Sequence, residues 1–169
     1  MEKWKIKLTF LGMIITIKSG ALIPVLLMLP NVVWILLPKA DAGEQVSVPL
    51  FVTIVENVGR AAVLILPLFY SLDLGKRSST LVMIGMGLAL TVYYVSWIRY
   101  FVGGRSAALL GAPLLGIPLP MAVAPTLFLV LSSYLTSSWL MLSASILFGV
   151  AHIWVSAVSL EVEKLIVGS

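Results

Sequence analysis

Four polar side chains interrupt the apolar segment 48–72, where a membrane helix would carry only apolar residues. They are Thr53, Glu56, Asn57 and Arg60. Residues three, four or seven positions apart lie on one face of an α-helix, so this spacing groups the four side chains together. A charged side chain near the centre of a membrane helix costs about 2.5 to 3.5 kcal/mol on insertion scales, and it usually faces a protein interior, a partner charge or a water-filled cavity. The pattern therefore predicts a polar site inside the membrane.

Two other apolar segments carry polar or aromatic groups at a similar depth. Glu56, Tyr93 and His152 each lie eight residues from the outer end of their segment, which corresponds to about 12 Å of helix. We expect the three segments to line one pocket in the outer half of the membrane. The residues expected to bind a ligand there are Glu56, Asn57, Arg60, Tyr93, Trp97, Arg99, Arg105 and His152.

The arginines favour an anionic ligand. If Arg60 neutralises Glu56, then Arg99 and Arg105 leave the mouth of the pocket positive. A planar guanidinium donates paired hydrogen bonds to a carboxylate or a phosphate. These residues predict binding and transport of a small polar or anionic solute, with Glu56 and His152 available for proton coupling.

Each of these groups also has a structural interpretation. Glu56 and Arg60 stand at positions i and i+4, so they could simply neutralise each other between helices. The tyrosines and Trp97 are typical of an aromatic belt at the membrane surface. His152 is the only histidine and has no acidic or cysteine companion at ligand spacing, so we expect no metal site. A hydrogen-bonded packing role for His152 is an alternative to proton transfer.

The sequence leaves two other functions open. An intramembrane enzyme acting on a lipid or an isoprenoid-like phosphate could use Glu56 or His152 as general base. No catalytic motif such as G-x-S-x-G or H-E-x-x-H supports this reaction class, and no motif indicates a cofactor. A non-catalytic assembly or sensor subunit of a membrane complex would use the same polar stripes as helix interfaces.

The composition indicates which elements carry these residues. The chain of 169 residues is 60% hydrophobic and 11% charged, with a mean hydropathy of +1.11. Soluble domains carry about 25% charged residues. We therefore expect an all-α integral membrane protein with one membrane domain, residues 1–169, and no separate catalytic or nucleic-acid-binding domain. The absence of cysteine excludes disulfides, thiolate metal sites and cysteine nucleophiles.

About 20 apolar residues cross the hydrocarbon layer as a helix. Five segments qualify as transmembrane helices: 19–38, 48–72, 78–101, 116–136 and 138–160. Residues 1–18 have an apolar face and a lysine-bearing face, which predicts an amphipathic helix lying on the membrane lipids. A cleaved signal peptide is the alternative for this end, but Pro24 and Pro30 interrupt its apolar region and favour an uncleaved span.

Glycine and proline are dense in residues 103–125, before the fourth span. Such breakers predict a broken or re-entrant segment, or a proline-kinked helix entry with an interfacial loop. Six basic residues fall on one side of the predicted membrane and four on the other. The positive-inside rule then places the N-terminus in the cytoplasm and the C-terminus outside a plasma (inner) membrane. Because five spans enclose little volume, we expect a homo-oligomer or a subunit of a membrane complex.

Overall fold

The computed structural model describes residues 19–37, 48–106 and 108–167, with side chains as far as residue 162. Its elements are α2 (Leu22–Leu36), α3 (Leu50–Ile65), the 3-10 helix η1 (Leu66–Phe69), α4 (Ser79–Val102), α5 (Ala108–Gly111), α6 (Pro120–Thr136) and α7 (Trp139–Val167). Within these ranges, β-type pairing consists of two isolated bridges. The prediction of an all-α chain is confirmed. The amphipathic helix expected at residues 1–18 lies outside the described residues.

Three described stretches are helical, long enough and apolar enough to cross a membrane: Leu50–Phe69, Ser79–Val102 and Trp139–Val162. Two shorter apolar helices, α2 and α6, accompany them. Large apolar side chains are exposed on the outer faces of the bundle, including Ile35, Phe51, Leu81, Val102 and Trp139. Soluble monomers rarely expose apolar surface on this scale, so the arrangement is consistent with a helical membrane protein.

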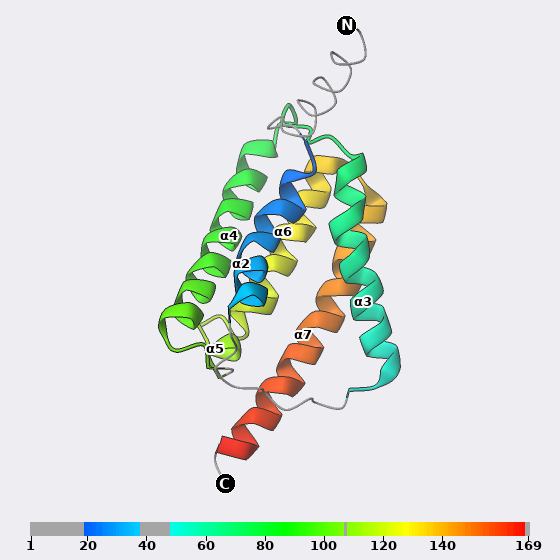
Figure 1. Cartoon of the computed structure of the whole chain (residues 1–169). Helices are drawn as coiled ribbons and strands as arrows, with labels where there is room; N and C mark the ends of the chain where they lie inside the picture. Colours follow the sequence, from blue (N-terminus) through cyan, green and yellow to red (C-terminus); the bar gives the residue numbers. More distant parts are fainter. Residues whose placement is uncertain (1–18, 38–47, 107, 168–169) are drawn as a thin grey trace, which may run out of the picture.

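The helices α2, α3, α4, α6 and α7 alternate in direction along the chain (Figure 1). The most extensive contacts join α4 with α6, α6 with α7 and α7 with α3, while α2 contacts α3, α4 and α6. The connections from α3 to α4 and from α6 to α7 lie at one end of the bundle, and α5 lies at the other (Figure 1). We call this second end the α5 end. The N-terminus of α3 and the C-termini of α2, α4 and α7 lie toward it.

The segment between α4 and α6 is broken, as its glycines and prolines indicated. α4 ends at Val102, and a turn with Gly104 in the left-handed region leads to the single turn of α5. A second turn, closed by paired backbone contacts between Leu114 and Ile117, precedes α6. α6 begins only at Pro120, because Leu119 before it has a left-handed backbone and proline suits the first helical turn. The helix is therefore shorter than the expected span 116–136.

Glycines on α3 and α7 allow three helices to pack closely. A Cβ atom on Gly59 of α3 would lie 2.9 Å from the Phe148 Cβ atom of α7 and 3.0 Å from its Cα atom. A Cβ atom on Gly149 of α7 would lie 2.2 Å from the Cγ2 atom of Thr126 on α6. Small residues let helix backbones approach each other, which is a common basis of association in membranes. Gly59 and Gly149 thus determine how closely α7 packs against α3 and α6.

Candidate functional site

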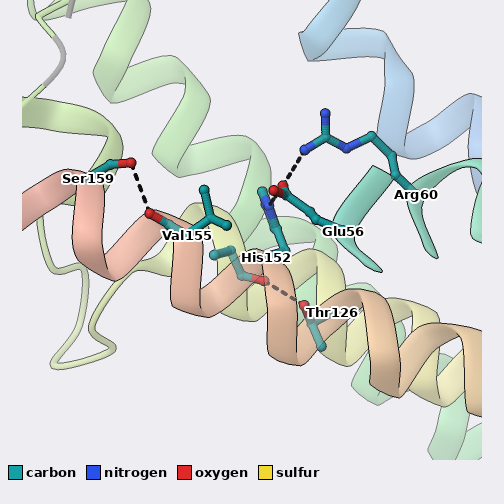
Figure 2. A network of polar contacts seen from close by, with 7 residues as sticks. Glu56, Arg60, Thr126, His152, Val155 and Ser159 are labelled. Atoms are coloured by element: carbon teal, nitrogen blue, oxygen red, sulfur yellow. Dashed lines mark hydrogen bonds and ion pairs between the residues drawn. The ribbon is translucent and has the colours of Figure 1, made fainter. Parts of the chain in front are cut away.

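Glu56 is buried between α3 and α7, with an exposed fraction of 6%. Arg60, one helical turn later on α3, forms an ion pair with its Oε1 atom. His152 of α7 places its Nδ1 atom 2.9 Å from the same oxygen. Figure 2 shows both contacts converging on the carboxylate. One acidic group therefore joins two basic side chains from two helices, and we call Glu56, Arg60 and His152 the α3–α7 triad.

The three side chains of the triad differ in access to their surroundings. The side chain of Glu56 is 9% exposed, that of His152 25% and that of Arg60 47%. A guanidinium carries five N–H donors. Among the described residues, Glu56 is the one hydrogen-bond partner of the Arg60 side chain. The carboxylate is thus buried, whereas the guanidinium is about half exposed and has N–H donors that Glu56 does not use.

Local sequence explains why the triad assembles. Val52, Glu56, Gly59 and Val63 form the buried face of α3, at helical spacing. Gly59 lies against Phe148 of α7 and permits the close approach of the two helices. Phe148 stands one turn before His152 and stacks on its ring, with centroids 5.0 Å apart and planes inclined by 13°. The imidazole is therefore held by a ring on one side and the carboxylate at its edge.

Asn57 does not share the buried face of α3. It is exposed, whereas Glu56 is buried, and Thr53 is partly exposed. The reason is the offset of one residue, which turns Asn57 about 100° around the helix from Glu56. The polar stripe expected from the sequence is therefore divided, with Asn57 outside the contacts of the triad.

Tyr93 belongs to a second polar cluster, between α2 and α4. Its hydroxyl accepts a hydrogen bond from Asn31 Nδ2 at 2.7 Å and lies 3.2 Å from the Leu27 carbonyl oxygen, to which it donates. About one turn further along α2 and two turns further along α4, Trp34 Nε1 donates to the Tyr100 hydroxyl at 3.1 Å. These contacts hold α2 against α4. The sequence interpretation placed Tyr93 with Glu56, but the hydrogen bonds of its side chain are with α2.

Asn31 was absent from the expected site, although it has a signal in the sequence. It is the amide side chain within the apolar segment 19–38, where no charged residue lies between Lys18 and Lys39. Amide side chains in such segments commonly bond across to another helix. What the sequence could not supply is the partner, because Tyr93 lies 62 positions away.

Of the remaining expected residues, Trp97 and Arg99 lie near the end of α4, and Arg105 lies in the turn after it. Trp97 is buried, meets Tyr93 and Tyr100 edge to face and stacks on Phe101 at 5.3 Å between centroids. Arg99 Nη1 donates to the carbonyl oxygen of Pro113 at 3.1 Å, which ties α4 to the segment before α6. Arg105 occupies a left-handed turn with φ of 62°, and its amide donates to the Tyr100 carbonyl. Of the expected residues, Glu56, Arg60 and His152 are therefore the ones that the contacts described above bring together.

The described residues hold no group of three or more His, Cys, Asp or Glu side chains that could bind a metal ion. No protein-family model, curated protein sequence or solved structure matches this chain.

Proposed function

We propose that the protein binds a small polar or anionic solute at the α3–α7 triad and carries it across the membrane. The observation that carries this proposal is the single buried carboxylate of Glu56 facing two basic groups, one of which, Arg60, is 47% exposed. A purely structural ion pair in a membrane would be expected to shelter both charges, because exposure of a charge to lipid is costly. Arg60 instead keeps donors that a solute can use.

The chemistry of the triad selects the solute. A guanidinium recognises a carboxylate, a phosphate or a simpler anion by charge and by its fork of N–H donors. The carboxylate of Glu56 stands on the inner side of the same guanidinium and repels a second negative charge brought too close. The site therefore favours a small anion with one negative charge over a highly charged one.

We propose that the three long helices and the shorter α2 and α6 all cross the membrane, with the N-terminus in the cytoplasm, and that the α5 end faces outward in a plasma (inner) membrane. The broken segment that contains α5 then lies at the outer surface as a re-entrant or interfacial element. Five helices leave little room for a pathway within one chain, so we propose that the protein works as a homo-oligomer or within a membrane complex.

Anion-dependent thermal stabilisation of the purified protein tests the binding step. We expect chloride, nitrate or inorganic phosphate to raise the melting temperature, because a ligand that binds only the folded state stabilises it by about 2.7 kcal/mol at a hundredfold excess over its Kd. Arg60→Gln should lose at least about 90% of this affinity, since a hydrogen bond to a charged group contributes about 1.5 to 3 kcal/mol.

Arg77→Gln is the matched control for this experiment. It removes one positive charge from an exposed position in the turn before α4, at the opposite end of the bundle from α5. The control should keep the stabilisation seen with wild-type protein. Equal responses to the anions in wild-type, Arg60→Gln and Arg77→Gln proteins would remove the triad as the binding site.

A further inference from the structure

We infer that the α3–α7 triad takes up one proton with each anion, and that His152 holds this proton. The inference rests on the proposed function and specifies its coupling ion. It follows from the charges of three side chains in direct contact: Arg60 is positive, Glu56 is negative as an ion-paired carboxylate, and His152 is neutral or positive. The triad therefore carries a net charge of zero without the proton and of +1 with it.

Charge balance inside the membrane then couples the two ligands. A monovalent anion bound to the neutral triad leaves one unbalanced negative charge, which the low-dielectric surroundings disfavour. The same anion bound to the protonated triad gives a complex of zero net charge. The proton and the anion each improve the binding of the other, and this effect is reciprocal by thermodynamic necessity.

The hydrogen bonds of Glu56 provide the mechanism of this coupling. Arg60 and His152 Nδ1 meet the same oxygen, Oε1, so the two basic groups share one acceptor. With His152 protonated, its N–H pairs with the carboxylate as a charged donor, and such bonds are about twice as strong as neutral ones. Glu56 is then balanced by His152, and the positive charge of Arg60 becomes available to the anion.

No other charged side chain on the described neighbouring elements competes for this role. α7 packs against α3, α6 and α5. α3 carries Glu56 and Arg60 as its charged residues, and α5 and α6 carry none. The titratable Tyr134 of α6 is exposed near Lys76, at the end of the bundle opposite α5. Glu161 of α7 is exposed and lies nine residues beyond His152, about 13.5 Å along the helix.

The packing of α7 changes at His152. Before His152 the helix presents a buried face formed by Met141, Ala144, Ser145, Phe148, Gly149 and Ala151. From His152 to Leu160 no residue is buried. Ser156 and Ser159, four and seven positions after His152, are partly exposed and continue its face of the helix toward the α5 end. The imidazole thus stands at the inner limit of the loosely packed half of α7.

The experiment compares anion affinity at several pH values, with chloride, nitrate and inorganic phosphate as probes and thermal stabilisation as the readout. Imidazole titrates between about pH 5 and pH 8. For wild-type protein and the monovalent probes, we expect affinity to fall as the pH rises through this range, by up to about tenfold for each pH unit, the limit for one proton per anion. His152→Gln should give a weak affinity that is independent of pH in this range. Glu161→Gln, which changes an exposed titratable group of the same helix, should keep the wild-type pH dependence.

The outcomes separate this inference from the proposed function. If wild-type protein binds an anion with the same affinity at about pH 5.5 and at about pH 8, proton coupling is refuted while anion binding stands. If none of the three probes binds at any pH, both proposals fail. The wild-type series decides the matter even if His152→Gln does not fold.

Discussion

Gly59→Leu is expected to destabilise the protein more than any exposed glycine substitution on the same bundle. A Cβ atom at residue 59 would lie 2.9 Å from the Cβ atom and 3.0 Å from the Cα atom of Phe148. Because the second contact is with backbone, rotation of a side chain cannot relieve it. Overpacking of this kind costs about 1 to 3 kcal/mol and occasionally more, and we expect the upper end of that range.

The matched control is Gly87→Leu on α4. A Cβ atom there would meet nothing within 4 Å, and the residue is exposed. Both variants gain the same helix propensity, about 0.8 kcal/mol relative to glycine, so this contribution cancels in the comparison. Melting temperatures in one detergent, with size-exclusion profiles, give the result. A Gly59→Leu protein as stable as Gly87→Leu would show that α3 and α7 do not pack as described.

Glu56→Leu should be strongly destabilising, for a different reason. The substitution removes the only partner that the structure gives to Arg60 and to the His152 Nδ1 atom among the described residues. Removing one member of a buried ion pair costs about 3 to 5 kcal/mol, because the remaining charge loses its compensation. Since Arg60 is half exposed, we expect a loss of about 3 kcal/mol, measured as the fall in unfolding free energy in mixed micelles.

The triple variant Glu56→Leu, Arg60→Leu and His152→Leu distinguishes a functional triad from a structural one. Replacement of a complete buried ion network by apolar residues is often neutral or stabilising. We therefore expect the triple variant to recover most of the stability that Glu56→Leu loses, while it binds none of the anions. A triple variant that remains as unstable as Glu56→Leu would indicate that the triad is needed to hold α3 and α7 together.

Local rules predicted part of the candidate site from the sequence. Glu56 and Arg60 stand one helical turn apart, so their contact needs only the periodicity of α3. His152 was grouped with Glu56 because both lie at the same depth, and the two side chains are in contact. The same depth argument also grouped Tyr93 with them, yet its hydrogen bonds are with Asn31 and Leu27 of α2. Equal depth places residues at the same level along the membrane normal, but it does not show which helices are adjacent.

The features that the sequence could not predict depend on contacts between distant helices. The role of Gly59 against Phe148 is one example, because it requires knowledge that α3 and α7 are adjacent. The all-helical fold and the broken segment before α6 followed from apolar runs and from proline and glycine. The start of α6 at Pro120 depended on the left-handed backbone of Leu119, which an apolar residue does not signal.

Transport of an anion by way of the α3–α7 triad is tested most directly by measuring anion flux into liposomes that contain only this protein and lipid. An inward gradient of chloride, nitrate or inorganic phosphate is imposed, and anion entry and lumenal pH are followed together. We expect wild-type protein to carry at least one of these anions and to acidify the lumen as it does so, whereas Arg60→Gln carries none and Arg77→Gln behaves as wild type. Folded wild-type protein that carries none of the three anions at any pH, or Arg60→Gln protein that carries them as fast as wild type, would contradict this expectation.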